Sequence, residues 1–241
     1  MDWSDYWATY PKSVGRTDYL RQVQSTIRGE PISDRQFRLS VEEICNLLEL
    51  KTDDTVIDLC CGNGLITKEL AARCTHVVGV DFSEPLLSVA NADHRPDGVQ
   101  YIRSDVLKLS SVAGVCDRRF TKAVMAGALQ HFRRRDLRVL LQSTMELLRL
   151  DGIFAITAVP NLKMKRAFYS TVRRRIAHLW YKARGRDAMG TWWNQQWIKT
   201  TCEELGLKCQ FHVPNDKDLS RYRFDVKVFR SRDALPGSGR V

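Results

Sequence analysis

The sequence predicts an α/β fold, in which a doubly wound, mostly parallel sheet of seven strands carries helices on both faces. Short apolar runs rich in β-branched residues recur along the 241-residue chain and alternate with segments of helical periodicity. Such runs are typical of strands buried on both faces. A glycine-containing turn, 60–64, also joins the first apolar run, 55–59, to the first helical segment. Strand, glycine turn and helix together open a nucleotide-binding βαβ unit.

The same two periodicities place the individual elements. Strands are predicted at 55–59, 76–80, 99–103, 120–125, 153–159, 207–213 and 222–229. Helices are predicted at 65–73, 83–91, 136–150 and 192–205, with a further apolar stripe before the first strand, from Phe37 to Leu48. Polar residues suited to cap helices precede three of these segments: Ser33 or Asp34, Ser83 and Thr191.

Three carboxylates stand at the ends of the first three predicted strands. Asp58 lies four residues before Gly62, Asp81 ends the second strand, and Asp105 follows the third. A carboxylate can bind an ammonium group or ribose hydroxyls, and the helix start beyond the turn offers unpaired N–H groups. Thr67 stands where the dinucleotide fingerprint has its third glycine, which argues against a nicotinamide oxidoreductase.

These motifs resemble those of the class I S-adenosylmethionine-dependent methyltransferases. The resemblance spans roughly 41–159 and rests on Asp58-x-x-x-Gly62-x-Gly64, Val80-Asp81-Phe82-Ser83 and Ser104-Asp105-Val106. It implies S-adenosylmethionine as the cofactor and an antiparallel last strand. It also implies that the glycine turn lines the amino-acid end of the cofactor and that Asp81 binds its ribose. Phe82 would pack on the adenine, and Asp105 with the Val106 N–H would bind the adenine edge. The implied set is Asp58, Cys60, Gly62, Asn63, Gly64, Asp81, Phe82, Asp105, Val106 and Ala126.

The resemblance also divides the chain. We expect a lid segment at 1–40, a Rossmann-like methyltransferase domain at 41–230 with an inserted cap at 160–190, and a disordered tail at 231–241. Trp3, Trp7 and Tyr10 fall at helical spacing and predict a short helix ending at Pro11. The residues expected in the lid or against the acceptor are Tyr6, Tyr10, Tyr19, Trp192 and Gln196.

His131 follows the fourth predicted strand, where the resemblance places the reacting groups. A histidine is the simplest general base for an alcohol or amine acceptor. The alternative is a structural histidine at the start of the next helix. Methyl transfer needs no dedicated base, because positioning and desolvation can supply much of the rate.

Positive charge is concentrated between Pro160 and Gly190. This segment holds nine Lys or Arg residues and one acid in a chain of net charge +10. It predicts an anionic partner, which would be a phosphate-bearing acceptor, nucleic acid or an acidic membrane surface; a solvated helix face is the alternative.

Composition narrows the class of protein further. No apolar run approaches the ~20 residues that span a bilayer, and seven cysteines without repeated spacing predict no disulfide framework. The five histidines are scattered, so we expect no metal site. The reducing cytoplasm is the expected compartment.

The predicted function is methyl transfer from S-adenosylmethionine to an oxygen, or less readily a nitrogen, of a small sugar-like or phosphate-bearing metabolite. Two alternatives remain. One is an RNA or tRNA methyltransferase that uses 160–190 to contact phosphates. The other is a non-catalytic subunit that binds the cofactor and supports a partner enzyme.

Overall fold

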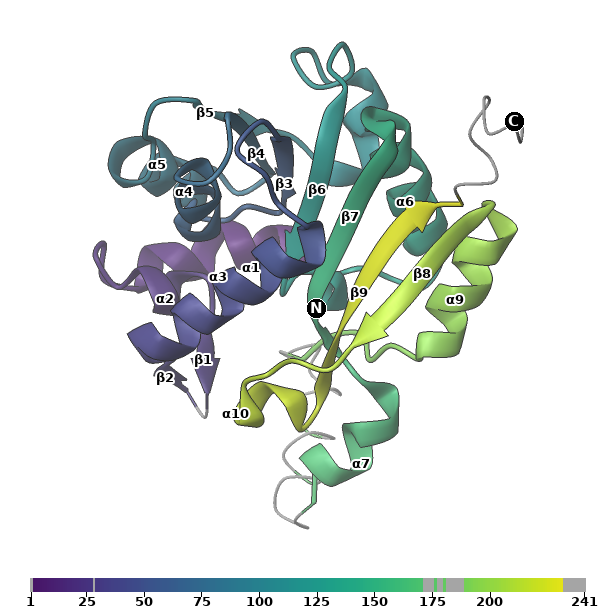
Figure 1. Ribbon diagram of the computed structural model, residues 1–241. Coiled ribbons are helices and arrows are strands. Elements are labelled where there is room, and N and C mark those ends of the chain that lie inside the picture. Colours follow the sequence, from purple (N-terminus) through teal and green to yellow (C-terminus); the bar gives the residue numbers. More distant parts are fainter. Residues whose placement is uncertain (1, 28, 171–175, 177–179, 181–188, 232–241) are drawn as a thin grey trace.

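The computed structural model describes residues 2–27, 29–170, 176, 180 and 189–231. Its main sheet contains β3 (Thr55–Leu59), β4 (His76–Asp81), β5 (Val99–Arg103), β6 (Phe120–Ala126), β7 (Leu148–Pro160), β8 (Leu207–His212) and β9 (Arg223–Arg230). The strand order is β5-β4-β3-β6-β7-β9-β8, and β9 runs antiparallel to both neighbours. The predicted doubly wound, mostly parallel sheet with an antiparallel last strand is therefore confirmed (Figure 1).

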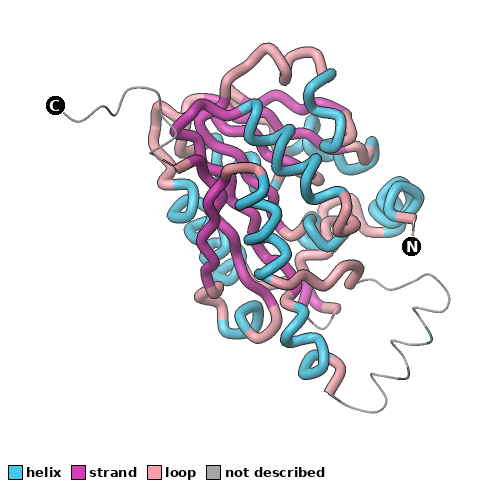
Figure 2. Tube along the Cα trace, turned by 90° about the vertical axis from the view of Figure 1, so that its right-hand side faces the viewer, coloured by secondary structure: helices cyan, strands magenta, loops and turns pink. Residues whose placement is uncertain are grey.

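Helices flank this sheet on both sides (Figure 2). The α-helices are α1 (Trp3–Thr9), α2 (Tyr19–Gln22), α3 (Asp34–Leu48), α4 (Leu65–Ala71), α5 (Glu84–Asp93), α6 (Asp136–Leu147), α7 (Lys165–Phe168), α9 (Gln195–Glu204) and α10 (Lys217–Ser220). Short 3-10 helices are η1 (Tyr10–Ser13), η2 (Val106–Ser111), η3 (Leu129–His131) and η4 (Leu162–Met164). A separate hairpin pairs β1 (Thr26–Ile27) with β2 (Glu30–Pro31).

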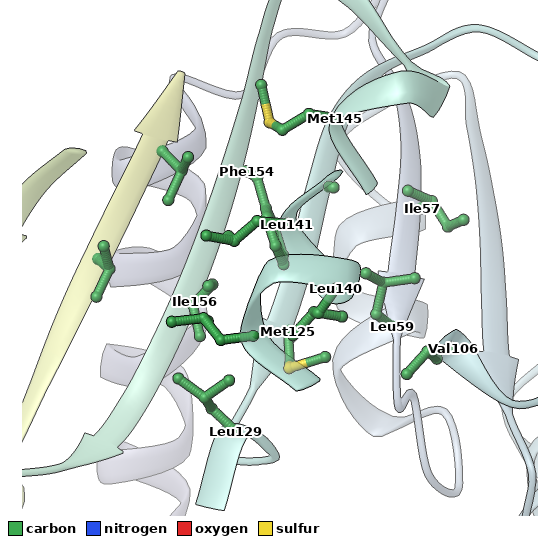
Figure 3. Packing of buried hydrophobic residues seen from close by; sticks show 14 of the residues in the cluster. Ile57, Leu59, Val106, Met125, Leu129, Leu140, Leu141, Met145, Phe154 and Ile156 are labelled. Atoms are coloured by element: carbon green, nitrogen blue, oxygen red, sulfur yellow. The ribbon is translucent and has the colours of Figure 1, made fainter. Parts of the chain in front are cut away.

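Alternate residues of the central strands enter two different cores. Leu59 of β3 and Ile156 of β7 pack with Leu140 of α6, in the larger core shown in Figure 3. Val56 of β3 lies on the opposite face and packs with Ile44 of α3. Each buried aliphatic side chain contributes roughly 1.5–3 kcal/mol. Burial on both faces explains why these strands are continuously apolar.

The α6–β7 boundary differs from its prediction. The helix predicted to reach Leu150 ends at Leu147, because Leu148 already pairs with Phe120 of β6. The register then shifts, so that Ile153 pairs with Lys122 and the intervening residues remain inside β7. A local pattern does not report this pairing with a distant strand.

Two of the three predicted caps, Ser33 and Ser83, stand at the N-cap positions of their helices, but only Ser33 makes the capping hydrogen bond. Ser33 caps α3 in a capping box. Ser83 instead donates its hydroxyl to the Trp7 carbonyl at 2.7 Å, and Thr191 donates to the Phe132 carbonyl at 2.7 Å. The helix predicted at 192–205 is α9, and it begins later than predicted, after Asn194, whose side chain accepts from the Gln196 N–H at 2.9 Å.

The N-terminal helix forms as predicted, and its aromatic residues lie close to α5 and the 127–132 loop. Pro11 does not end the helical course, because the chain continues as η1 with the proline in its first turn. Figure 1 shows the purple N-terminal helices below α4 and α5.

Much of the predicted cap and nearly all of the predicted tail lie outside the described residues. Within the part of the chain that is described, no helix combines the length and apolar character needed to cross a membrane. The same part contains no cluster of three or more His, Cys, Asp or Glu side chains placed to bind a metal ion.

Candidate functional site

A cavity of about 1270 Å³ opens at the carboxyl ends of β3, β4, β6 and β7. β3 lies between β4 and β6, so the cavity sits at the topological switch point where α/β sheets bind ligands. All of the residues predicted to bind the cofactor line it except Gly64. The sheet has thus brought to one site the acids at the ends of β3, β4 and β5, together with residues at the ends of β6 and β7.

Gly64 does not line the cavity, but it determines the shape of the turn that does. Its φ is +81°, and a Cβ there would lie 2.2 Å from the Tyr101 phenol oxygen. That phenol donates to the His94 carbonyl at 2.6 Å, which holds the ring in place. Glycine is therefore required for both torsion and space, and it begins α4 with its N–H groups beside the cavity.

Asp58 is a buried carboxylate at the end of β3. Oδ2 accepts a 2.7 Å hydrogen bond from the Thr67 hydroxyl on α4. Burial raises the pKa of Asp58 to about 7, with the Thr67 bond opposing the rise and nearby Asp81 adding to it. A cationic group bound in the cavity would reverse this shift. The threonine in place of a third glycine is thus part of the site.

Asp81 organises the backbone of two turns. Its Oδ2 accepts from the Gly62 N–H at 2.9 Å, and its Oδ1 accepts from the Ser83 N–H at 2.7 Å. Burial raises the pKa of Asp81, while these backbone N–H groups oppose the rise. Each oxygen retains a lone pair for a hydroxyl group. The carboxylate therefore both shapes the site and lines it.

The residues that follow β5 form a more exposed part of the cavity wall. Asp105 accepts a 3.0 Å bond from the Leu107 N–H and begins η2, and it remains exposed at the cavity. Phe82 and Val106 line the same region, with Val106 buried. This combination provides an apolar slot with a carboxylate at its rim.

Asn63 was expected to contact the cofactor, but its side chain also makes contacts within the protein. Its amide nitrogen donates to the Tyr19 carbonyl at 2.9 Å and to Gln22 Oε1 at 3.0 Å. The side chain is fully buried, and its Oδ1 has no hydrogen-bond partner. Asn63 therefore ties the N-terminal segment to the glycine turn as well as lining the cavity.

The N-terminal segment forms one wall of the cavity with residues other than those predicted. Trp3 and Trp7 line it, as do Val23, Ile27, Ile32 and Phe37. The predicted Tyr6, Tyr10 and Tyr19 do not: the Tyr6 hydroxyl accepts from Gln24, the Tyr10 hydroxyl donates to the Arg21 carbonyl, and the Tyr19 ring contacts His94 edge to face. Spacing of i, i+4 puts Trp3 and Trp7 on one helix face and Tyr6 and Tyr10 on the next.

The two residues predicted on the far side also miss the cavity. Trp192 is buried against Phe168, with ring centroids 5.4 Å apart. Gln196 lies on the exposed face of α9. Phe168 itself lines the cavity, so Trp192 supports the wall from outside.

His131 lies in the cavity wall between two indole rings. Its ring centroid is 4.1 Å from that of Trp3 and 5.4 Å from that of Trp7. Burial and the nearby Arg223 cation lower the pKa of His131 to about 3. The imidazole is therefore neutral at pH 7, and so weak a base is poorly matched to proton abstraction.

A β-bulge shapes the end of β7 beside the cavity. Ile156 pairs with Val226 and Val159 with Phe224, which leaves Thr157 and Ala158 opposite the single residue Asp225. Ala158 has a φ of +57°, an uncommon torsion for a residue with a Cβ. Such bulges occur next to active sites, where they redirect backbone groups.

Comparison with known proteins identifies this architecture. Residues 56–152 match a family model described as a methyltransferase domain. Over these residues the chain is a methyltransferase domain, and its fold is the Rossmann-like one. The matched residues include the strand ends that carry Asp58, Asp81 and Asp105.

Several named proteins are similar to this chain. A 2-phytyl-1,4-naphtoquinone methyltransferase of Thermosynechococcus vestitus is 25% identical over 68% of this chain and 64% of its own length. The chain thus spans slightly less than two thirds of that relative. The magnesium protoporphyrin IX methyltransferase of Synechocystis PCC 6803, solved with bound SAH, is 13% identical, with a TM-score of 0.66 over 95% of this chain and 97% of its own. A DhpI–SAH complex has a TM-score of 0.64, with 13% identity over 95% of both chains.

Sequence reasoning missed several groups in this site. Thr67 was recognised only as a replacement for a third glycine, although a hydroxyl in the first turn of α4 can reach the acid at the end of β3. Arg223 and Gln130, 93 residues apart, share a 2.9 Å hydrogen bond at the cavity wall, and no local pattern signals it.

Proposed function

We propose that this chain transfers the methyl group of S-adenosylmethionine to an oxygen of a small molecule that carries an anionic group. The observation that supports this most is the shared cavity of Asp58, Asp81 and Asp105 at successive strand ends. Three such acids match the ammonium, ribose and adenine of one adenosyl ligand. The methyltransferase-domain family model that residues 56–152 match supports the same chemistry.

The residues present fit that ligand. The raised pKa of Asp58, about 7, indicates a carboxylate that lacks a cationic partner, and the ligand's ammonium would supply one. The remaining lone pairs of Asp81 suit the ribose hydroxyls, and the slot of Phe82 and Val106 suits the adenine, with Asp105 at its rim. Gly62 permits close approach of the backbone at a φ of +58°.

Transfer would depend on placement more than on proton abstraction. The ligand supplies an electrophilic methyl group on a sulfonium, and an acceptor oxygen attacks it in line. Trp3 and Trp7 line the cavity and exclude water, and an aromatic face attracts a cation by about 0.5–2 kcal/mol. With its low pKa, His131 suits this apolar wall better than the role of general base predicted for it.

The acceptor side of the cavity is mainly apolar, with cationic groups at one end. Ile27, Ile32, Phe37 and Phe168 line it, and so do two arginines, Arg221 and Arg223. This lining supports the anionic acceptor predicted from the sequence more than the sugar-like one. The names of two of the similar enzymes refer to a quinone and to a porphyrin. Both are large ring compounds, which agrees with the volume of this cavity.

Calorimetry with S-adenosylhomocysteine tests the cofactor half of the proposal. We expect the wild type to bind and Asp81→Asn to weaken binding more than about tenfold, since hydrogen bonds to a charged group contribute roughly 1.5–3 kcal/mol each. Asp53→Asn is the matched control, because Asp53 is an exposed acid before β3 that does not line the cavity. Absence of binding by the wild type would refute the proposal.

Labelled S-adenosylmethionine tests the transfer. We expect label to enter a metabolite extract and not bulk RNA. Labelled RNA, with affinity falling by orders of magnitude between low and moderate salt, would favour the alternative that uses the basic segment. Cofactor binding without any transfer would favour a non-catalytic subunit.

A further inference from the structure

Arg223 begins β9 and lines the acceptor end of the cavity. One nitrogen of its guanidinium, Nη1, donates to Gln130 Oε1 at 2.9 Å and to the Ala158 carbonyl. Its Nε–H is buried and has no hydrogen-bond partner. The side chain is therefore held by one edge, while the other edge has an unmet donor.

No acid of the described chain forms an ion pair with this cation, although Asp225 is near enough to feel its charge. The ion pairs among the described residues do not include Arg223, so no carboxylate oxygen there lies within 4.0 Å of it. Asp225, two residues along β9, uses Oδ1 to accept the Ala158 N–H at 2.7 Å. A half-buried cation with a buried, unpaired N–H is costly unless an anion binds it.

Only part of the guanidinium can reach a ligand in the cavity. Nε is enclosed by protein, whereas Nη2 makes no hydrogen bond to the described residues, so a carboxylate in the cavity would be bound through the N–H groups of Nη2. Aromatic rings lie beside the guanidinium: the Tyr222 ring centroid is 5.3 Å from the Arg223 guanidinium carbon, and the Phe168 ring centroid is 4.8 Å from that of Tyr222. An anion bound here would carry an apolar or aromatic body.

We propose that Arg223 binds the carboxylate of the methyl acceptor and that the acceptor is a carboxylic acid with an apolar body. The inference rests on the proposed function and specifies its substrate class. The carboxylate would lie beside Gln130, in the 127–132 loop that follows β6. Anchored there, the acceptor extends into the cavity toward the strand ends that hold the three acids.

A second arginine distinguishes a carboxylate from a phosphate. Arg221 also lines the cavity, but it is exposed, and exposed Asp218 lies along the same wall. One guanidinium satisfies a monocarboxylate, whereas a dianionic phosphate would favour both arginines. The structure therefore assigns the recognition to Arg223 alone.

Binding of small probes to the protein saturated with S-adenosylhomocysteine tests this assignment. The probes are a panel of aromatic and alkyl monocarboxylates including 2-naphthoate, together with 2-naphthyl phosphate and the uncharged 2-naphthalenemethanol. We expect Arg223→Met to weaken carboxylate binding by more than about tenfold and to leave the uncharged probe within about twofold. Arg221→Met is the matched control and should change carboxylate binding by less than about threefold.

Arg223→Lys guards against a folding defect in the methionine variant. Lysine keeps a charge but not the planar, fixed donors of the guanidinium, so we expect carboxylate affinity between those of the other two proteins. Carboxylate binding that is equal in wild type and Arg223→Met, stronger binding of the phosphate, or no binding of any carboxylate would each overturn the assignment. The preceding titration with S-adenosylhomocysteine separates the two proposals, because a failure there concerns the cofactor and not Arg223.

Discussion

The carboxylate of Asp225 accepts a 2.7 Å hydrogen bond from the backbone N–H of Ala158, across the bulge between β9 and β7. The carbonyl of Ala158 accepts from Arg223 on the same strand as Asp225. Two side chains of β9 therefore hold both polar groups of one residue with a left-handed φ of +57°. This arrangement positions Arg223 at the cavity.

Asp225 should make stability depend on pH. Burial and the nearby Glu43 raise the pKa of Asp225 to about 6, above its value in the unfolded chain, although the Ala158 N–H and Arg223 oppose the rise. A raised carboxyl pKa stabilises the fold below the unfolded value, and that contribution is lost as pH rises toward 6. We expect wild type to lose on the order of 2 kcal/mol through this residue between pH 4 and pH 7.

Asp225→Asn isolates that contribution, because asparagine keeps the acceptor for Ala158 and cannot ionise. Urea unfolding at several pH values should show the variant gaining on wild type as pH rises. Parallel curves for the two proteins would contradict the expected titration.

Ala158→Gly should stabilise the protein by up to about 1 kcal/mol, since glycine adopts a positive φ without the Cβ penalty. Ala155→Gly is the matched control on the same strand: Ala155 is fully buried with ordinary strand torsions, so glycine there should destabilise. Chemical denaturation measures both. Equal losses in the two variants would show that Ala158 is not under strain.

Thr67→Val should weaken the binding of S-adenosylhomocysteine near neutral pH. Loss of the 2.7 Å bond from Thr67 raises the pKa of Asp58 beyond about 7, so a proton must leave before an ammonium can pair with the carboxylate. Wild-type affinity should fall by up to about tenfold per pH unit below 7, and the valine variant should begin to fall at higher pH.

Calorimetry in buffers of different ionisation heat would report the proton released on binding. Thr67→Ser retains the hydroxyl and should follow wild type. Identical pH profiles for valine and serine variants would rule out the proposed coupling.

Gly64→Ala should destabilise the protein by more than about 2 kcal/mol. The new Cβ would lie 2.2 Å from the Tyr101 hydroxyl in addition to the torsional penalty at φ +81°. Gly206→Ala serves as the control, because Gly206 has a φ of +68° and open space around it. The difference between their denaturation midpoints measures the clash alone, and a difference near zero would show that the Tyr101 ring moves aside.

Local sequence patterns were sufficient where short-range physics decides the structure. The run from Asp58 through the glycine turn into α4 combines burial on two faces, a left-handed glycine and a helix start, each of which depends on neighbouring residues. Because parallel strands end at one edge of a sheet, Asp81 and Asp105 could be placed beside Asp58 in advance. The role of each acid toward a ligand stays a prediction.

The acceptor side could not be derived in this way. The choice of Trp3 and Trp7 over Tyr6 and Tyr10 depended on which face of α1 meets the 127–132 loop, and one helical stripe does not specify its partner. The end of α6 likewise depended on the pairing of Leu148 with Phe120.

The amino-acid sequence by itself determined the order of strands and helices, the glycine turn and the row of three strand-end acids, because periodicity and backbone torsion act between near neighbours. Only the tertiary structure decided that Arg223 faces the acceptor cavity with Ala158 and Gln130 on one edge. Those contacts join residues 65 and 93 positions apart, and they exist only once the antiparallel β9 has been packed beside β7.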